Sequence, residues 1–519
     1  MRSRNGILLA AVLGSGIVFL DSTVVNVALP AIGRDVDSSF FGVFEAQSYV
    51  YYGYLLTLSS LLILAGALAD HHGRKRMFVI GLVGFGLTSV LCGLAPNMDL
   101  LIVGRILQGV AGAFLIPGSL ALITTSFSGE EQGRAFGIWA GASGATAIFG
   151  PPLGGALVTV TSWRAVFLIN VPLIAVALWA TLKHVPESRD VHSRGTFDRF
   201  GALTIVVALA GLTFGTIRGQ AEAWSTPVGP IALLVGAAAL AAFVVLQRRV
   251  DNPLVPLDLF RSRNFTVTNI STFLIYGALY VSFQYLALHL IGTLGYNELG
   301  YGLGGLVGPL FLVLFSSRVG AVAARRGPRW FMTAGPALMG LGLLWLGRLP
   351  ADSDPWVART TDPSTWLPPR GYVVDVLPGM VLFGIGLVIM VAPLTTALMR
   401  SVPPAKSGVA SAINNAISRI GPQLGGALLF VAATASFYGT LGNLAPAVDT
   451  ASPVTRAELT PFNPPPDRSP PELRDVVARA STEAFQLTAL VSAALCAAGA
   501  IVNGVGIRND QLHDSDAVA

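Results

Sequence analysis

The sequence contains one string twice, first as Gly150-Pro151-Pro152-Leu153-Gly154-Gly155-Ala156-Leu157 and again as Gly421-Pro422-Gln423-Leu424-Gly425-Gly426-Ala427-Leu428. Each copy lies inside an apolar stretch that is long enough to cross a bilayer. A second pair agrees with the first, because the segment from Gly66 to Arg74 has an echo between Gly320 and Arg329. Two matched pairs in the same order predict two similar halves that run in the same direction.

The composition is that of a membrane protein. Of 519 residues, 53% are hydrophobic and only 12% are charged, whereas soluble domains carry about a quarter charged residues. Lipid must therefore solvate much of the apolar surface. The two cysteines, Cys92 and Cys496, both lie in apolar spans, so we expect no disulfide framework, no metal and no cofactor. The first apolar run exceeds the about 7–15 residues of a signal-peptide core, and we expect it to remain as a membrane helix.

We expect an all-α integral membrane protein with fourteen spans, since a spanning helix needs about 20 mainly apolar residues. The repeats leave two spans unpaired between two pseudo-symmetric six-helix bundles. We therefore expect an N-terminal bundle over 1–190, two linking helices over 191–260 and a C-terminal bundle over 261–519. Parallel repeats of this kind are typical of secondary transporters, whose substrate site lies between the halves. The spans centre near residues 18, 58, 86, 111, 146, 174, 209, 238, 278, 307, 338, 385, 420 and 495.

Arginine and lysine predict the orientation, because the cytoplasmic loops of membrane proteins are rich in both. With the N-terminus inside, the short outside loops hold only Arg34 and Arg164. We expect both termini in the cytoplasm, and the net charge of +5 then calls for no nucleic-acid partner. The proline-rich loop 436–482 either covers the outer mouth or is a solvated linker, and residues 472–484 could form a short helix that leads into the last span.

Asp21 is the only acid that we place deep inside a span, where a charge costs about 2.5–3.5 kcal/mol on insertion scales. Arg105 is a natural partner, because the two residues lie at depths of about 14 Å and 9 Å from the outer surface at 1.5 Å per residue. A carboxylate whose surroundings change between two states is what a proton carrier requires. The alternative is a permanent salt bridge that only locks the first and fourth spans together.

The fifth span carries small residues and prolines that suit a close but movable helix contact. Gly150 and Gly154 are four residues apart, and with Gly144 and Gly155 they let another helix approach. Pro151 and its neighbour Pro152 remove backbone donors and bend the helix. The alternative is ordinary tight packing.

The loop between the second and third spans could latch one conformational state. Gly66 permits close approach, Gly73 allows a tight turn, and Asp70 can pair with a cation such as Arg74 or cap a helix start. Ala324 replaces the acid in the second half, so we expect one complete latch of this kind. Positive-inside signalling accounts for part of the charge.

The ninth span has an aromatic stripe that is either packing or the wall of a cavity for an apolar or cationic substrate. It corresponds to the first span if the halves match, and would face the same cavity as Asp21. Arg419, deep in the thirteenth span, is either a second charge of the site or a structural hydrogen-bond donor. The candidate cavity residues of the ninth span are Phe273, Tyr276, Tyr280 and Gln284.

Five motifs resemble the major facilitator superfamily, and in particular its fourteen-helix drug/proton antiporter family. The resemblance implies a proton-coupled exporter of small lipophilic or cationic compounds that works as a monomer by alternating access. It also places Asn26 and Gln108 in signature motifs, and we expect both at the substrate cavity. The motifs are Leu20–Pro30, Gly66–Arg76, Arg105–Gly109, Gly144–Gly155 and Trp163–Pro172.

Other functions stay open beside this one. The same fold could hold a dedicated exporter of one metabolite or lipid, or a facilitator or importer in which Asp21 and Arg105 are purely structural. A membrane enzyme is a poor third possibility, because the six histidines form no metalloprotease-type pair. The chain also lacks a phosphate-binding loop of the Walker type, so export would draw on an ion gradient rather than on ATP.

Overall fold

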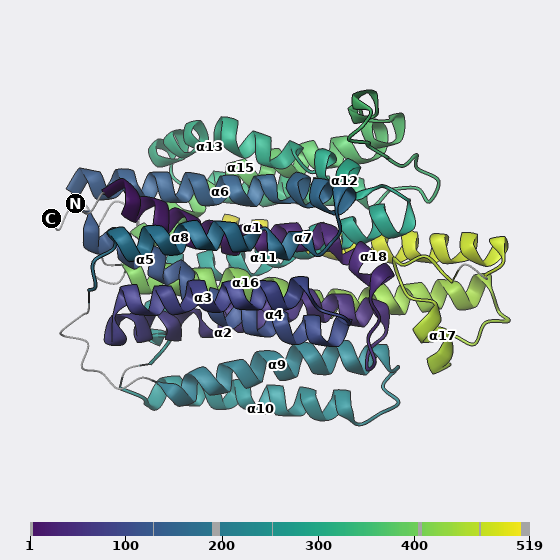
Figure 1. Cartoon of the computed structure of the whole chain (residues 1–519), viewed down its shortest axis with the longest axis horizontal. Coiled ribbons are helices and arrows are strands. Elements are labelled where there is room, and N and C mark those ends of the chain that lie inside the picture. Colours follow the sequence, from purple (N-terminus) through teal and green to yellow (C-terminus); the bar gives the residue numbers. More distant parts are fainter. Residues whose placement is uncertain are drawn as a thin grey trace. The chain divides into compact units, whose positions relative to one another are not determined.

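The computed structural model describes residues 4–127, 129–188, 198–251, 253–402, 407–466 and 469–509. These residues form helices and no strand (Figure 1). Among them, eleven helical stretches are long and apolar enough to cross a membrane. Together with α2 (Val43–His72), α6 (Gly129–Val160) and α14 (Arg329–Leu346) they make fourteen helical segments, and each predicted span centre falls in a helix. The prediction of an all-α membrane fold is therefore confirmed.

The chain divides into two compact units. Unit 1 comprises Met1–Val207 and Ala239–Leu254, and unit 2 comprises Ala208–Ala238 and Val255–Ala519. The helices that lie wholly in unit 1 are α1 (Arg4–Asp35), α2 (Val43–His72), α3 (Arg74–Gly93), α4 (Met98–Gly112), α5 (Leu115–Ser126), α6 (Gly129–Val160), α7 (Ala165–Leu168) and α8 (Asn170–His184). Two spans are interrupted, so that α4 with α5 and α7 with α8 each make one crossing.

Unit 2 repeats this plan with more irregular turns. Its helices are η1 (Leu257–Arg261), α11 (Arg263–Ala287), η2 (Leu288–Thr293), α12 (Glu298–Gly304), α13 (Val307–Arg326), α14 (Arg329–Leu346), η3 (Pro363–Trp366), η4 (Tyr372–Val376), α15 (Leu377–Arg400), α16 (Ser407–Leu444), α17 (Pro453–Glu458) and α18 (Pro471–Gly506). Of these, η2 and η4 are π-helical turns, which the apolar periodicity gave no reason to expect.

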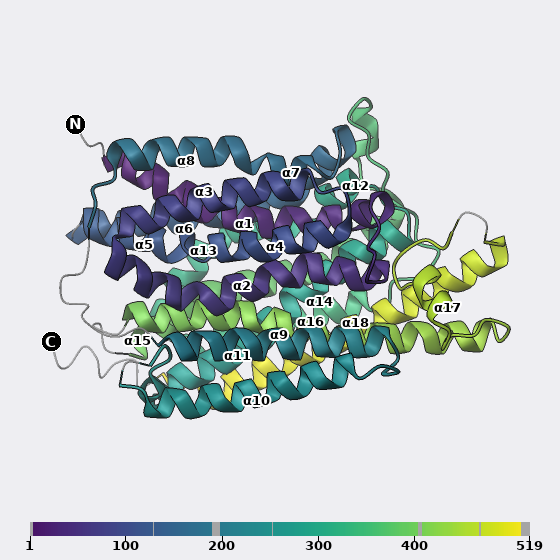
Figure 2. The same cartoon turned by 60° about the horizontal axis from the view of Figure 1, so that its bottom comes forward.

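The two linking helices, α9 (Arg199–Ala221) and α10 (Val228–Arg249), form a hairpin (Figure 2). The turn of the hairpin belongs to unit 2, and its open end belongs to unit 1. In unit 2 the backbones meet at Gly211 and Gly236, where an added Cβ would overlap the facing helix. In unit 1 the buried side chain of Gln247 donates to Asp198 Oδ2 across 2.5 Å, and Asp198 Oδ1 accepts from the Gly201 N–H at the start of α9.

The long loop before the last span is more ordered than its prolines suggest. Helix α16 continues to Leu444, and α17 lies beside the projecting ends of α16 and α18 (Figure 1). The expected helix at 472–484 is the first part of α18. The side chain of Phe462 is fully buried between the rings of Tyr285 and His289, at centroid distances of 5.6 and 6.2 Å. The part of the loop around Phe462 is thus packed against the rest of unit 2 and is no solvated linker.

Candidate functional site

The two charges expected in the first and fourth spans meet in the core of unit 1. Asp21 lies in α1 and Arg105 in α4. Arg105 Nη1 donates to Asp21 Oδ2 across 2.5 Å, and neither side chain has any exposed surface. The sequence predicted that both charges share a layer, and the structure brings them into direct contact. Since burying an ion is costly, each charge stabilises the other here.

The second carboxylate oxygen of Asp21 is held by two amides. Oδ1 accepts from Gln108 Nε2 at 3.1 Å and from Asn170 Nδ2, at the start of α8, at 3.0 Å. Both amides also donate to Ser89 Oγ of α3, at 2.8 and 3.3 Å. Asp21 therefore has three side-chain donors from two other helices, an environment that suits an ionised carboxylate.

Arg105 has further partners besides Asp21. Its Nη1 also donates to Gln108 Oε1 at 2.6 Å, and its Nε donates to the backbone oxygen of Val50 at 3.1 Å. The guanidinium lies 4.1 Å from the centre of the Tyr54 ring, and the Tyr54 hydroxyl donates to the Val18 oxygen. Nη2 has no hydrogen-bond partner among the described residues. One strong donor is thus left over inside the bundle, where an unmade hydrogen bond is costly.

The first copy of the repeated string packs α6 against α1. A Cβ added to Gly150 would overlap Thr23 Oγ1, and one added to Gly154 would lie 3.1 Å from the Val24 oxygen. Gly155 is buried, and Pro151 and Pro152 lie inside α6. Gly144 belongs to the same helix, but its surroundings lie outside what the structure describes. The close contact expected from this string is present two residues beyond Asp21.

The second copy makes the corresponding contact in unit 2. A Cβ on Gly421 would overlap the Phe273 backbone oxygen, and one on Gly277 would lie 3.2 Å from the Gly421 oxygen. Nearer the start of both helices, Asn414 of α16 donates to Asn269 and Thr272 of α11. Residues later in α16 contact residues later in α11, so the two helices run parallel. Gly150 and Gly421 hold the same position in the two copies of the string, so Phe273 in unit 2 corresponds to Thr23 in unit 1. By the same spacing, Tyr276 corresponds to Asn26.

The expected latch loop is held by a residue that sequence reasoning missed. Gly73 has φ 110°, which favours glycine. The Glu187 carboxylate, from the segment after α8, accepts from the backbone N–H groups of Lys75 (3.1 Å) and Arg76 (3.2 Å) at the start of α3. The Arg74 N–H donates to the Ser188 oxygen. An anion at a helix N-terminus is favourable, so Glu187 stabilises the start of α3.

The other predicted latch residues make fewer described contacts. Gly66 lies in α2, where a Cβ would touch Pro117 at 3.5 Å. The side chain of Asp70 lies outside the described part of the structure. In unit 2, Gly327 has φ 82°, and Asn509 Oδ1 accepts from the Arg329 N–H at 3.4 Å. A neutral amide therefore stands there where unit 1 has the Glu187 carboxylate.

The predicted cavity residues are distributed over both units. Gln108 belongs to the Asp21 network. Asn26 is 7% exposed, and its Oδ1 has no hydrogen-bond partner among the described residues. In unit 2 the rings of Tyr276 and Tyr280 are 6.2 Å apart, and Arg419 acts electrostatically on Tyr276. Gln284 is fully buried in the same helix as both tyrosines.

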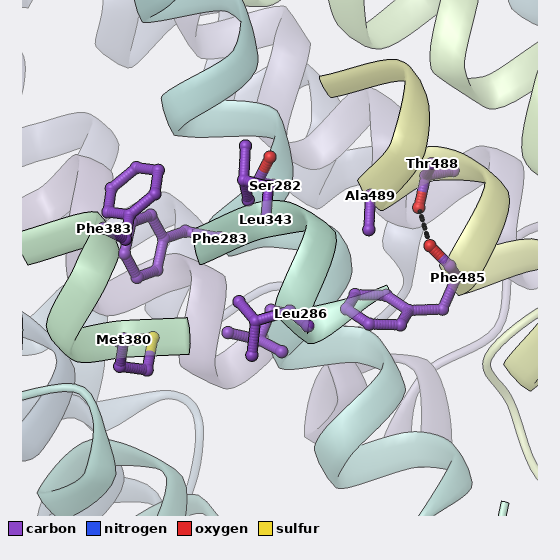
Figure 3. A pocket seen from close by; sticks show the side chains of 10 residues that line it. Ser282, Phe283, Leu286, Leu343, Met380, Phe383, Phe485, Thr488 and Ala489 are labelled. Atoms are coloured by element: carbon purple, nitrogen blue, oxygen red, sulfur yellow. Dashed lines mark hydrogen bonds between the residues drawn. The ribbon is translucent and has the colours of Figure 1, made fainter. Parts of the chain in front are cut away.

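A small apolar pocket lies inside unit 2 (Figure 3). The ring of Phe283 in α11 packs edge-on against Phe383 at a centroid distance of 5.2 Å, and both rings line this pocket. Ser282 Oγ has no partner among the described residues, whereas Thr488 donates to the Phe485 oxygen. The pocket is lined by Ser282, Phe283, Leu286, Leu343, Leu346, Met380, Phe383, Phe485, Thr488 and Ala489.

Known proteins are similar to this chain in sequence and in fold. A sequence model of the Major Facilitator Superfamily matches residues 11–426. The Multidrug resistance protein Stp of Mycobacterium tuberculosis (strain CDC 1551 / Oshkosh) is 34% identical over 427 residues, which is 81% of this chain and 74% of that protein. The Probable actinorhodin transporter of Streptomyces coelicolor is 32% identical over 88% of this chain and 77% of its own length.

Two further similarities agree with these. The Tetracenomycin C resistance and export protein of Streptomyces glaucescens is 32% identical over 82% of this chain and 75% of that protein. Among solved structures, a bacterial homolog of the human lysosomal transporter Spinster, inward-facing and unoccupied, has a TM-score of 0.60. That comparison covers 96% of this chain and 98% of the other at 16% identity, and it supports the fold alone.

Proposed function

We propose that Asp21 is the group that couples export to protons in this chain, which belongs to the Major Facilitator Superfamily and is a drug-efflux transporter. The observation that carries this proposal is the buried carboxylate with an arginine and two amides on its oxygens. Such a group is well satisfied when ionised, so a change in its surroundings would change its affinity for a proton.

The network supplies Arg105 with other acceptors for the protonated state. Arg105 already donates to Gln108 Oε1 at 2.6 Å and to the Val50 oxygen at 3.1 Å, and these acceptors do not depend on the charge of Asp21. The arginine is then not left without acceptors, and α1 loses its strongest tie to α4. The membrane potential contributes about 2.3 kcal/mol per charge per 100 mV to proton entry. Protonation would thus loosen unit 1, and release of the proton would restore the ion pair.

We assign supporting roles to the other candidate residues. Asn26, Tyr276 and Tyr280 line the substrate path in the two halves, with Gln284 further along α11. The close contacts at Gly150, between α6 and α1, and at Gly421, between α16 and α11, let each pair of helices shift while the two helices stay in contact. The loop around Gly73, capped by Glu187, latches one state. We further propose that the protein works as a monomer in the plasma membrane. The arginine distribution favours an orientation with both termini in the cytoplasm.

Substrate-induced proton movement tests the proposal. Purified parent protein and the Asp21→Asn variant are placed in proteoliposomes with an internal pH dye, and candidate lipophilic compounds are added under an imposed pH gradient. The matched control is Asp99→Asn, which removes a carboxylate at the start of α4 that binds Ser38 and the Ser39 N–H. The parent and the control should give a substrate-dependent pH signal that Asp21→Asn lacks.

A second candidate function is a dedicated exporter of one compound. Relatives of this chain are named for one antibiotic each, among them actinorhodin and tetracenomycin C. A dedicated exporter would give the pH signal with one chemical class and with no other.

A pH signal of equal size from the parent and Asp21→Asn would instead favour the structural ion pair, since the carboxylate is fully enclosed in the conformation described.

A further inference from the structure

The turn between the two linking helices is bound by an arginine of the long loop before α18. We infer that Arg456 is a positioning residue for transport, which fixes this turn to unit 2 throughout the transport cycle. The open end of the hairpin belongs to unit 1. The linking helices would then follow both halves of the transporter, one half at each end, and would not be a passive connection.

The side chain of Arg456 reaches from α17 to the end of α9. Its Nη1 donates to the backbone oxygen of Gln220 at 3.0 Å and to that of Ala221 at 3.4 Å. These are the last two residues of α9, and the final carbonyl groups of a helix lack donors within the helix. A helix C-terminus also carries a partial negative charge, so a guanidinium is favourable there.

The guanidinium of Arg456 is held from its other side as well. Its Nε donates to the Thr450 backbone oxygen at 2.9 Å, and its carbon lies 4.2 Å from the centre of the Tyr438 ring on α16. The Tyr438 hydroxyl donates in turn to the Leu459 oxygen at 3.0 Å. Among the described residues, no carboxylate pairs with Arg456. Its donors are thus directed at backbone oxygens of α9 and of its own loop.

The loop that carries Arg456 is anchored in unit 2 at Phe462. The Phe462 N–H donates to Ser481 Oγ of α18 at 3.1 Å, and a Cβ added to Gly292 of η2 would overlap the Phe462 oxygen. Phe462 has φ 63°, which is strained for a bulky residue and persists only where the surroundings impose it. Arg456 therefore extends from a segment that is wedged between η2 and α18.

The turn itself transmits the contact from α9 to α10. Ala223 and Trp224 have φ 51° and 59°, so the chain reverses sharply after α9. Trp224 Nε1 donates to Gln220 Oε1 at 3.1 Å, and a Cβ added to Gly219 would overlap the Trp224 ring. Because the turn is packed back onto the last residues of α9, the contact with Arg456 also restrains the start of α10.

The expected role of this contact follows from the way such transporters work. In alternating access the two halves move relative to each other, and a hairpin with one end in each unit has to follow both. Arg456 lies in the loop before the last span and is not among the residues assigned to coupling or to the substrate path. Its loss should therefore slow the cycle without weakening substrate binding.

Hydrogen exchange and export rate test the two parts of the inference. Parent and Arg456→Gln are compared in lipid nanodiscs for exchange at the amides of residues 221–226. Loss of hydrogen bonds from a charged donor should speed exchange there by about tenfold. In proteoliposomes, with the compound that gives the parent its largest pH signal, the maximal export rate should fall several-fold at unchanged half-saturating concentration. The exchange measurement needs no substrate, so it stands apart from the proposal for Asp21.

A covalent replacement of the contact supplies a rescue. Ala221→Cys and Arg456→Cys are combined and joined by a short bifunctional methanethiosulfonate reagent, from which the native Cys92 and Cys496 are protected by burial. The unlinked double variant should behave like Arg456→Gln. The linked protein should regain the export rate, and reduction should remove it again. Arg479→Gln, at an exposed position of α18, is the control and should change neither measurement.

Three results would overturn the inference. They are unchanged exchange at the turn in a folded Arg456→Gln variant, an export rate of that variant equal to the parent's, and loss of export after cross-linking. The last result would mean that the turn has to leave Arg456 during the cycle. Melting temperature and elution volume report folding. Arg456→Lys, which keeps the charge but not the planar fork, should give intermediate values and replaces Arg456→Gln if that variant does not fold.

Discussion

Asn170 Nδ2 donates a hydrogen bond of 3.0 Å to Asp21 Oδ1, which joins the start of α8 to the centre of α1 inside unit 1. Asn170 is fully buried, and its amide also donates to Ser89. The contact gives the carboxylate a neutral donor in addition to Arg105. Asn170 therefore supports the ionised form of Asp21 and ties a third helix to the ion pair.

Asn170→Leu should lower the free energy of unfolding by about 1–3 kcal/mol, because Asp21 and Ser89 lose a donor in a buried place. Thermal melting of the purified protein measures the loss. Asn443→Leu, at an exposed position of α16, should leave the melting temperature nearly unchanged. A melting temperature for Asn170→Leu equal to that of the parent would mean that this hydrogen bond does not stabilise unit 1.

Arg105→Gln should destabilise the protein by about 3–5 kcal/mol, since it leaves the Asp21 charge buried without its partner. The double variant Asp21→Asn with Arg105→Gln should recover much of that loss, because two neutral amides can hydrogen-bond to each other. A double-mutant cycle on melting data gives the coupling energy. Additive losses would show that the two side chains do not interact in the folded protein.

Gly150→Ala should cost about 1–3 kcal/mol through overlap with Thr23, in line with other overpacked sites. Adding Thr23→Ala removes the overlapping hydroxyl and should restore part of the stability. Gly421→Ala should resist such rescue, because its Cβ would meet the Phe273 backbone oxygen. The control is Gly439→Ala, where nothing lies within 4 Å of an added Cβ. If Gly150→Ala melted like this control, the close contact would be absent.

Glu187→Gln should destabilise the start of α3 by about 0.3–2 kcal/mol, because it removes an anion from a helix N-terminus. The effect should shrink as salt is added. Hydrogen exchange at the amides of Lys75 and Arg76 measures it locally, and Asp352→Asn at an exposed loop position serves as the control. Unchanged exchange at both amides would refute the capping role of Glu187.

Composition and repeats were sufficient to predict the fold. The doubled string fixed the order of the two halves, and the apolar runs fixed the helices, because lipid allows few alternatives to a helix. The interrupted spans and π-turns were not predictable, since they depend on local packing. The loop before α18 was harder still, because the burial of Phe462 is a long-range contact that prolines in the loop do not reveal.

Part of the site was also accessible from the sequence. Asp21 and Arg105 stood out because charges are rare in spans, and helix rise placed them at similar depth. Ser89 and Asn170 were not found, since a single serine or amide in a span has many possible roles. Asn170 lies in the motif Trp163–Pro172, and its amide stands between the apolar residues Ile169 and Val171, but neither signal pointed to Asp21. Glu187 lay in a loop, where a charge is ordinary, and only the folded contact distinguishes it.

The most direct test of the central claim compares two activities of Asp21→Asn in proteoliposomes. One is accumulation of labelled substrate driven by an imposed pH gradient, and the other is exchange of labelled for unlabelled substrate without a gradient. We predict that the variant exchanges substrate at a rate near that of the parent but accumulates none. Accumulation at the parent level by Asp21→Asn would contradict the assignment of Asp21 as the proton-coupling group.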